Sequence, residues 1–175
     1  YMTADPAAHN ENAYRHLLES LRLDTGNAET YYLLWMLMHN DDPNHLLIQK
    51  SLYLDSTLFL AHYSAAVAFA KKKDFEAALP LYRRCIRINP DHPMPYVGLG
   101  NAYSQLKQYV SAIKAYQASL RLDPDYIDSY LYIGLAYYYI GEDKAAAKHL
   151  KTYLKKLPDT PYRDRIETIL KEIKK

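Results

Sequence analysis

Three phrases decide the fold of this chain: Ile88-Asn89-Pro90, Leu122-Asp123-Pro124 and Lys156-Leu157-Pro158. Their prolines are 34 residues apart (124 − 90 and 158 − 124). A fixed period of this size is typical of proteins built from stacked helical repeats. In such proteins the core is a ribbon that neighbouring repeats share, and each repeat packs on the next. The period therefore predicts the architecture, although it does not say what the array binds.

Each 34-residue segment contains two helical patterns. Between Pro93 and Pro124, apolar residues recur at i, i+3, i+4 and i+7 on both sides of the polar break Lys107-Gln108. Residues 127–158 repeat this pattern around Gly141-Glu142-Asp143. Two amphipathic helices joined by a short turn form an antiparallel hairpin. The sequence therefore predicts a series of helix hairpins.

Glycine occurs inside the first helix of the two most regular segments, at Gly100 and Gly134. Glycine inside a helix costs about 1 kcal/mol relative to alanine. We therefore expect a partner helix to cross these positions too closely for a side chain. We also expect small residues of the second helices to lie on the other side of this contact. These residues are Ala78, Ala112 and Ala146.

The pattern resembles the tetratricopeptide repeat, whose signature is W-x2-L-G-x2-Y, then A-x3-F, then P. The looser copy before Pro90 departs from it at His62 and Ala66. The resemblance implies an all-α fold, a right-handed solenoid of antiparallel helix hairpins with a C-terminal capping helix. The matching residues are Tyr96, Leu99, Gly100, Tyr103, Ala112, Tyr116 and Pro124, and one repeat later Tyr130, Ile133, Gly134, Tyr137, Ala146, Leu150 and Pro158.

We expect residues 1–175 to form one array of unequal repeats. The start of the chain has a second-helix pattern without its first helix, so we also expect the chain to be a piece of a longer protein. The C-terminal segment carries Ile166, Ile169, Leu170 and Ile173 on one face and charges on the other, as a terminal cap requires. The expected parts are a leftover helix at 5–25, a shortened repeat at 26–56, repeats at 57–92, 93–126 and 127–158, and a capping helix at 159–175.

The predicted binding surface follows from the resemblance, because the first helices of successive hairpins line the concave side of tetratricopeptide arrays. The helix at 127–140 is apolar on two faces, whereas its own hairpin explains one. We interpret the second face as an aromatic groove; the alternative is that neighbouring first helices cover it. The predicted partner-binding residues are Tyr63, Val67, Met94, Val97, Asn101, Leu131, Tyr132, Leu135, Tyr138 and Tyr139.

One subfamily of these repeats clamps the C-terminal carboxylate of chaperones with lysine, arginine and asparagine. The same positions in this chain hold no basic residue, and Asp128 would repel a carboxylate. We therefore do not expect recognition of a chaperone tail by that clamp. The residues at these positions are Tyr63, Val67, Gly98, Asp128 and Tyr132.

Clusters of charged side chains and histidines raise two other kinds of ligand, nucleic acid and metal ions. Lys71-Lys72-Lys73 occupies a predicted turn, and four lysines recur at helical spacing in 144–155, but no nucleic-acid-binding motif accompanies them. We interpret them as a solvated outer face. His39, Asp41, Asp42 and His45 crowd one turn, yet their spacing matches no zinc signature, and we interpret them as capping residues. We predict no metal and no cofactor.

Neither catalysis nor membrane insertion is predicted. The chain has no phosphate-binding glycine loop, no nucleophile elbow and no metalloprotease motif. We interpret its single cysteine, Cys85, as a small core residue and not as a reactive thiol. No run of about 18 apolar residues occurs. We expect a soluble chain, with a cytoplasmic location favoured and a periplasmic one left open.

Charge is spread unevenly along the chain. Residues 1–60 hold three basic and eight acidic side chains (3 − 8 = −5), and residues 141–175 hold ten basic and six acidic ones (10 − 6 = +4). Such asymmetry can orient a partner or promote head-to-tail association.

We therefore predict a non-catalytic protein-interaction module or assembly scaffold. It would bind a peptide or helix of a partner protein in the concave groove by apolar and tyrosine contacts. The alternatives are a chaperone-like adaptor, a repeat segment of a larger enzyme or of a secretion or pilus-assembly machine, and a self-associating scaffold.

Overall fold

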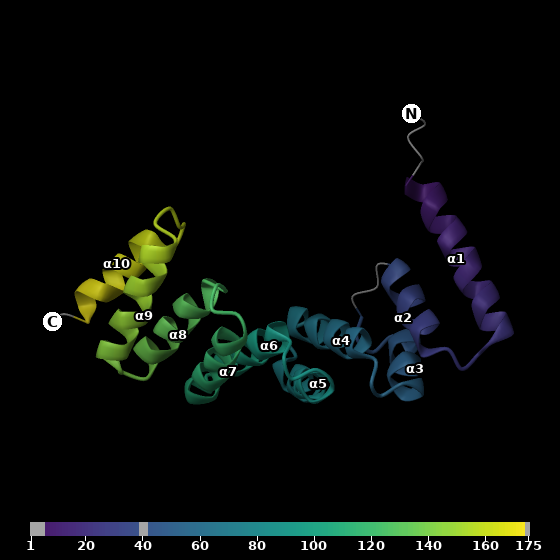
Figure 1. Ribbon diagram of the computed structural model, residues 1–175, viewed down its shortest axis with the longest axis horizontal. Coiled ribbons are helices and arrows are strands. Elements are labelled where there is room, and N and C mark those ends of the chain that lie inside the picture. The colour runs from purple at the N-terminus through teal and green to yellow at the C-terminus, as the bar shows by residue number, and fades with distance from the viewer. Residues whose placement is uncertain (1–5, 39–41, 174–175) are drawn as a thin grey trace. The chain divides into compact units, whose positions relative to one another are not determined.

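A computed structural model describes residues 6–38 and 42–173 (Figure 1). These residues form ten helices and no strand, which confirms the predicted all-helical repeat solenoid. The chain divides into two compact units, Tyr1–Asp74 and Phe75–Lys175, and the boundary falls inside the predicted repeat at 57–92. Unit 1 contains α1 (Pro6–Leu23), α2 (Ala28–Leu37), α3 (Leu46–Leu54) and α4 (Phe59–Lys71), and unit 2 contains α5 (Phe75–Ile88), α6 (Pro93–Gln105), α7 (Tyr109–Leu122), α8 (Asp128–Tyr139), α9 (Asp143–Lys156) and α10 (Arg163–Glu172).

The turn inside a hairpin has the same backbone geometry at three places, 34 residues apart. Lys73, Lys107 and Gly141 have φ values of 63°, 58° and 76°. After α6, the backbone N–H of Lys107 donates to Ser104 and that of Gln108 donates to Tyr103. This pair of bonds closes the C-terminus of a helix with one left-handed residue. The repeat thus extends to backbone conformation, although two of the three positions carry lysine.

The turn between hairpins is closed by an Asp or Asn side chain. In each case an oxygen of that side chain accepts a hydrogen bond from the backbone N–H two residues later, at 2.7–3.3 Å. Short polar side chains favour such turns because they hydrogen-bond the adjacent backbone. Along the chain, the first two of these residues are 31 positions apart and the last three are each 34 apart. The shorter spacing falls in the shortened repeat at 26–56. They are Asp24, Asp55, Asn89 and Asp123.

The glycines inside α6 and α8 lie against large side chains. A Cβ added at Gly100 would lie 2.5 Å from Cε1 of Tyr116, and one added at Gly134 would lie 2.7 Å from Cγ of Leu150. The close crossing is therefore as predicted, but the nearest atoms belong to Tyr116 and Leu150. The expectation that Ala112 and Ala146 supply this contact is wrong. Both alanines are fully buried and leave room for the larger residue one turn later.

Hydroxyl pairs join the end of one hairpin to the start of the next. In unit 2, Ser119 Oγ lies 3.0 Å from Ser129 Oγ, and in unit 1, Ser20 Oγ lies 3.3 Å from Thr30 Oγ1. The equivalent serine of the shortened repeat, Ser51, is fully buried, and its hydroxyl has no hydrogen-bond partner among the described residues. Ala61 occupies the position, ten residues later, that Thr30 and Ser129 occupy in the other pairs. The shortened repeat therefore lacks the second hydroxyl of this buried pair.

The C-terminal helix α10 caps unit 2. Ile166 and Ile169 are buried in a cluster with Leu131, Leu150 and Tyr153, and Leu170 and Ile173 pack at its edge. Arg163, Asp164, Arg165 and Glu167 lie on the other side of the helix and are at least partly exposed. An apolar inner face and a charged outer face are what the end of a stacked array needs.

Candidate functional site

Helix α8 presents different residues on different sides. Leu131, Ile133 and Ala136 are buried in contacts with the neighbouring helices of unit 2. Tyr132 and Leu135 are half-buried, and Tyr139 is 51% exposed. Part of the second apolar face is therefore covered by the fold, and part of it reaches the surface.

The uncovered part of this face lines a pocket of about 440 Å³. Helix α8 contributes Tyr132, Leu135 and Tyr139, and the other lining residues come from the start of α5, the second half of α6 and the middle of α7. No residue of the lining is charged. The other lining residues are Phe75, Asn101, Ser104, Gln105 and Tyr116.

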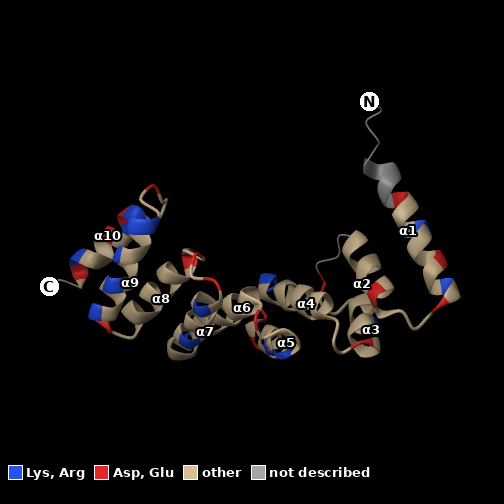
Figure 2. Cartoon of the chain, in the orientation of Figure 1, with Lys and Arg blue, Asp and Glu red and all other residues tan. Residues whose placement is uncertain are grey.

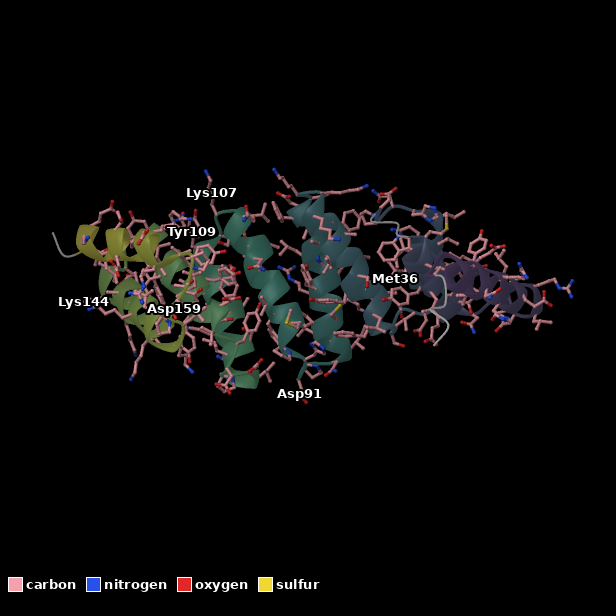
Figure 3. All side chains as sticks on the ribbon, turned by 90° about the horizontal axis from the view of Figure 1, so that it is seen from above. Met36, Asp91, Lys107, Tyr109, Lys144 and Asp159 are labelled. Carbon is pink, nitrogen blue, oxygen red and sulfur yellow. The ribbon has the colours of Figure 1, made fainter. Side chains whose placement is uncertain are left out.

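Tyrosine rings build the walls of the pocket by contact with one another. The ring centroids of Tyr116 and Tyr132 are 5.3 Å apart, and those of Tyr109 and Tyr139 are 4.9 Å apart and stacked (Tyr109 is labelled in Figure 3). Offset or tilted aromatic pairs at these distances are favourable beyond their buried area. The rings are therefore held in place before a ligand arrives.

One buried hydroxyl orients the polar part of the lining. Tyr116 is buried, and its hydroxyl donates a 2.7 Å hydrogen bond to Oδ1 of Asn101. That bond leaves the NH2 group of Asn101 to donate elsewhere, since Oδ1 is the acceptor. Burial raises the pKa of Tyr116, and burial, with Asp128 nearby, raises the pKa of Tyr132 to about 12. Both phenols are neutral donors at physiological pH.

The capping helix fixes the exposed end of α8. The hydroxyl of Tyr138 donates a 2.7 Å hydrogen bond to the carboxylate of Glu172, and the guanidinium of Arg165 donates to the hydroxyl of Tyr139 at 3.4 Å. The bond to Glu172 raises the pKa of Tyr138. Tyr138 thus serves the packing of α10, while the ring of Tyr139 faces the pocket.

The structure brings four of the ten predicted partner-binding residues into this pocket: Asn101, Tyr132, Leu135 and Tyr139. Val97 and Leu131 are buried, so a partner on the surface would not reach them, and we leave both out of the site. Met94 and Tyr138 are half-buried and lie outside the pocket lining.

The two remaining predicted residues belong to unit 1. Tyr63 and Val67 line a smaller pocket of about 200 Å³ with residues of α2 and α4. The ring of Tyr63 stacks on that of Phe59, with centroids 6.0 Å apart. This smaller pocket lies in unit 1, whereas the pocket beside α8 lies in unit 2.

The ten predicted residues do not include four of the lining residues, Phe75, Ser104, Gln105 and Tyr116. Gln105 follows Asn101 by four residues, so helical spacing alone could have found it. Tyr116 fills a signature position of the repeat, and it was assigned to packing alone. Phe75 begins α5, and no local pattern links it to α6 or α8.

The predicted turn around Pro43 has structural roles. Asp42 accepts a 2.6 Å hydrogen bond from Lys72, which lowers the pKa of this carboxyl, and Nδ1 of His45 accepts from the backbone N–H of Leu47. His39 and Asp41 lie outside the described residues. Within residues 6–38 and 42–173, no group of three or more His, Cys, Asp and Glu side chains could hold a metal ion.

The lysine stripe of α9 is a solvated face. Lys144, Lys148, Lys151 and Lys155 are all exposed, and Ala146, Leu150 and Tyr153 on the other side of the helix are buried. Figure 2 shows these basic residues along α9. None of the helices seen in the described part of the chain combines the length and apolar character that crossing a membrane requires.

Comparisons with solved structures identify similar folds. Crystal structures of MamA include one that is 29% identical, with a TM-score of 0.76 over 86% of this chain and 90% of that chain. YrrB, described as a TPR protein with an unusual peptide-binding site, is 18% identical, with a TM-score of 0.80 over 93% and 85% of the two chains. The first TPR domain of Spaghetti (RPAP3), bound to the HSP90 peptide SRMEEVD, is 20% identical, with a TM-score of 0.61 over 69% and 93%. The last two likenesses concern the fold alone.

Comparison with curated proteins finds no match. Family models, by contrast, match the regular part of the chain. Two models described as tetratricopeptide repeat match residues 69–118 and 128–160, and a model described as TPR repeat matches residues 100–141. Over residues 69–160, which these three models match between them, the chain belongs to the tetratricopeptide repeat family.

Proposed function

We propose that this chain is a non-catalytic protein-interaction module that binds a peptide or a helix of a partner protein in the pocket beside α8. The observation that carries the proposal is the convergence of Tyr132, Leu135, Tyr139 and Asn101 on one pocket of about 440 Å³. Tyrosine is a frequent anchor of protein interfaces because a rigid ring gives a large contact area at a low entropy cost.

The lining indicates the chemistry of the ligand. The rings of Tyr132 and Tyr139 and the side chain of Leu135 suit an apolar or aromatic side chain of the partner. The amides of Asn101 and Gln105 can pair with the backbone N–H and C=O groups that flank such a side chain. We therefore propose a ligand segment with one large apolar residue between uncharged neighbours.

An acidic ligand fits this pocket poorly. The peptide bound by the first TPR domain of RPAP3, SRMEEVD, has three acidic residues among its last four. Carboxylates that leave water need a cation or several hydrogen-bond donors, and the lining of this pocket contains no Lys or Arg. The ligand proposed for this chain therefore differs from that peptide in charge.

The site is built to bind without rearrangement. Contacts among Tyr109, Tyr116, Tyr132 and Tyr139 fix the ring positions, and the two hydrogen bonds to α10 hold the end of α8. A preorganised site loses less entropy when a ligand binds.

Selection from a random peptide library on the full chain tests this proposal. We expect enriched peptides to share a large apolar residue without acidic neighbours. Tyr139→Ala together with Gln105→Arg should abolish their binding and leave the circular dichroism unchanged, because both side chains are exposed. Tyr162→Ala is the matched control, since Tyr162 is also exposed and lies outside the pocket lining. Enrichment of acidic C-termini, or equal binding by both variants, would contradict the proposal.

A further inference from the structure

A second pocket of unit 2 is lined by α6 and α7 alone, and we call it the α6–α7 pocket. It has a volume of about 290 Å³ and shares no lining residue with the pocket beside α8. Ala115 in its lining is buried, whereas the rings of Tyr96 and Tyr103 are half-buried. The lining includes Tyr96, Leu99, Tyr103, Lys114, Ala115 and Ala118.

The next hairpin has a ring in the equivalent place. The imidazole of His149 contacts two tyrosines, because its ring centroid lies 6.2 Å from that of Tyr130 and 5.7 Å from that of Tyr137. The α8–α9 hairpin therefore fills with its own side chain the place that is a pocket in the α6–α7 hairpin. The corresponding pairs, each 34 residues apart, are Tyr96 and Tyr130, Tyr103 and Tyr137, and Ala115 and His149.

The missing side chain indicates the shape of a ligand. Ala115 has a methyl group where His149 has a planar ring between two tyrosines. Burial, with Lys148 nearby, lowers the pKa of His149, so the ring that fills the equivalent place is neutral at physiological pH. Tilted and stacked aromatic contacts are favourable beyond the area that they bury. The α6–α7 pocket thus offers two aromatic contacts to a neutral planar ring.

Hydrogen bonds hold both tyrosines of the pocket in position. The hydroxyl of Tyr96 donates to the backbone carbonyl of Pro90 at 3.1 Å. The hydroxyl of Tyr103 accepts from the guanidinium of Arg83, which also lies over the ring, 5.8 Å from its centroid. A site whose side chains are already fixed loses less entropy when a ligand binds.

The charge around the pocket is positive. Helices α6 and α7 contain no Asp or Glu. Lys114 lines the pocket and is exposed, and Arg83 contacts the ring of Tyr103. Neither Lys114 nor Arg83 forms an ion pair with a carboxylate of the described residues. A carboxylate beside the bound ring would complement these two cations.

The two ends of the pocket differ in charge. Asp91 and Asp123 belong to the turns before and after this hairpin, at the end where Tyr96 lies. At the other end, Tyr103 contacts Arg83. The carboxylate of a ligand is therefore expected near Tyr103 and not near Tyr96.

The pocket is open at the surface, because Tyr96, Tyr103 and Ser111 are half-buried and Lys114 is exposed. Small ligands that bind well are buried over about 70–90% of their surface, which a free single-ring molecule would not reach here. An aromatic side chain of a polypeptide would add contacts from its neighbours in sequence. The open shape therefore favours a side chain over a free small molecule.

We propose that the α6–α7 pocket binds an aromatic side chain of a partner polypeptide that has an acidic residue next to it. The ring would take the place that His149 takes in the next hairpin, and the carboxylate would lie near Lys114. This second site differs from the pocket beside α8 in its lining and in the charge of its ligand. Either proposal can therefore fail without the other.

Alanine-methyl NMR of the full chain tests the proposal. The probe is the peptide acetyl-Gly-Glu-Trp-Glu-Gly-amide, and two control peptides replace its tryptophan by leucine or its glutamates by lysine. We expect the tryptophan peptide to move the methyl signal of Ala118, which lines the pocket, in a saturable way. The leucine peptide should bind about tenfold more weakly, since it makes no aromatic contact. The lysine peptide should bind about threefold more weakly, since its charges are repelled.

Two substitutions exchange the sites between the hairpins. Ala115→His should fill the pocket, as His149 fills its equivalent, and the Ala118 signal should then stay in place. His149→Ala should open a second site, and the peptide should then move the signal of Ala145, the equivalent of the pocket residue Ser111 (145 − 111 = 34). In the unmodified chain the Ala145 signal should not move. Because misfolding does not create a binding site, the gain in His149→Ala keeps the test decisive if Ala115→His does not fold.

A charge exchange completes the test. Lys114→Glu should weaken binding of the tryptophan peptide about threefold and strengthen binding of the lysine peptide. Lys151→Glu makes the same change at an exposed position of α9 and should leave both unchanged. The proposal would be overturned by a static Ala118 signal, by equal binding of the leucine peptide, by equal effects of the two lysine variants or by a static Ala145 signal in His149→Ala. Free indole-3-acetate that binds as tightly as the peptide would also overturn it, because the pocket would then be a small-molecule site.

Discussion

Units 1 and 2 are built from the same repeat, but they complete it to different degrees. In unit 2, Gly100 and Gly134 allow close crossings, and Ser119 pairs with Ser129. In unit 1, the spacing of the turns shortens to 31 residues, and the buried hydroxyl of Ser51 has no partner among the described residues. Unit 1 also leaves core positions uncovered between α1 and α2.

The difference between the units also shows in how far equivalent side chains are covered. In unit 2 the pocket beside α8 is lined by one core side chain, buried Tyr116, and by side chains that are half-buried or exposed, among them Tyr132 and Tyr139. The groove between α1 and α2 in unit 1 mixes the same two kinds of position. With a shift of 99 residues, Leu17 corresponds to Tyr116, whereas Leu33 and Met36 correspond to Tyr132 and Leu135 (116 − 17, 132 − 33 and 135 − 36). Ala13 is exposed and Leu17 is half-buried, whereas their equivalents Ala112 and Tyr116 are buried.

The largest expected effect on the free energy of unfolding comes from adding a methyl group at a glycine of unit 2. Gly100→Ala places a Cβ 2.5 Å from the ring of buried Tyr116, and this overpacking should lower the free energy of unfolding by about 1–3 kcal/mol. Gly26→Ala in unit 1 is the control, because its Cβ would meet one exposed carboxylate oxygen at 3.2 Å. Urea unfolding followed by circular dichroism compares the two. Equal effects would show that the close crossing is not what distinguishes the regular repeat.

The second prediction is that replacing equivalent serines by alanine changes the free energy of unfolding in opposite directions in the two units. Ser119→Ala leaves the buried hydroxyl of Ser129 without its hydrogen-bond partner, and it should lower the free energy of unfolding by about 1–2 kcal/mol. Ser51→Ala removes a buried hydroxyl that has no partner in the described structure, and it should stabilise unit 1 by up to about 1 kcal/mol. Fluorescence of the single tryptophan, buried Trp35, follows unit 1, and ellipticity follows the whole chain. If both variants were destabilised, the claim that Ser119 is paired and Ser51 is not would be contradicted.

The third prediction concerns alkaline pH. Burial raises the pKa values of Tyr116 and Tyr132 in unit 2, the latter from 10.0 to about 12. The neutral phenols therefore contribute stability that is complete below about pH 10 and is lost as the pH rises toward the folded-state pKa values. The urea midpoint should fall between about pH 10 and pH 12, and less so in Tyr132→Phe, which keeps the ring. An identical pH profile for the variant would contradict this assignment.

The smallest effect is expected at the hairpin turns. Lys107 has a φ of 58°, where Gly141 stands one repeat later. Because glycine adopts this conformation at little cost, Lys107→Gly should raise the free energy of unfolding by about 0.5–1 kcal/mol. The matched change in unit 1, Lys73→Gly, should have the same sign, since its φ is 63°. Thermal unfolding measures both, and a lower melting temperature for either would contradict the shared turn geometry.

The period of the sequence predicted the helices and turns of the regular repeats, because a 34-residue repeat encodes local structure copy by copy. The cap was predicted separately, from the apolar stripe Ile166, Ile169, Leu170 and Ile173. The period did not predict which residue lies opposite Gly100, since that depends on the relative rotation of α6 and α7. Helical spacing placed Leu131 and Tyr132 together on the second face. It could not show that Leu131 would be covered by the cluster around Ile166 while Tyr132 would line a pocket. Phe75 lies far from the other lining residues in sequence, and no periodic pattern connects it to them.

An environment-sensitive dye at the pocket tests the central claim most directly. Cys85, the single cysteine, is buried, and burial raises the pKa of its thiol to about 12, so a cysteine introduced at an exposed site is labelled selectively. The dye is attached to Gln105→Cys in the pocket lining and, as a control, to Tyr162→Cys outside it. We predict that a library-selected apolar peptide changes the emission at Gln105→Cys and leaves that at Tyr162→Cys unchanged, and that Tyr139→Ala removes the change. Equal responses at both positions, or a response that survives Tyr139→Ala, would contradict the account.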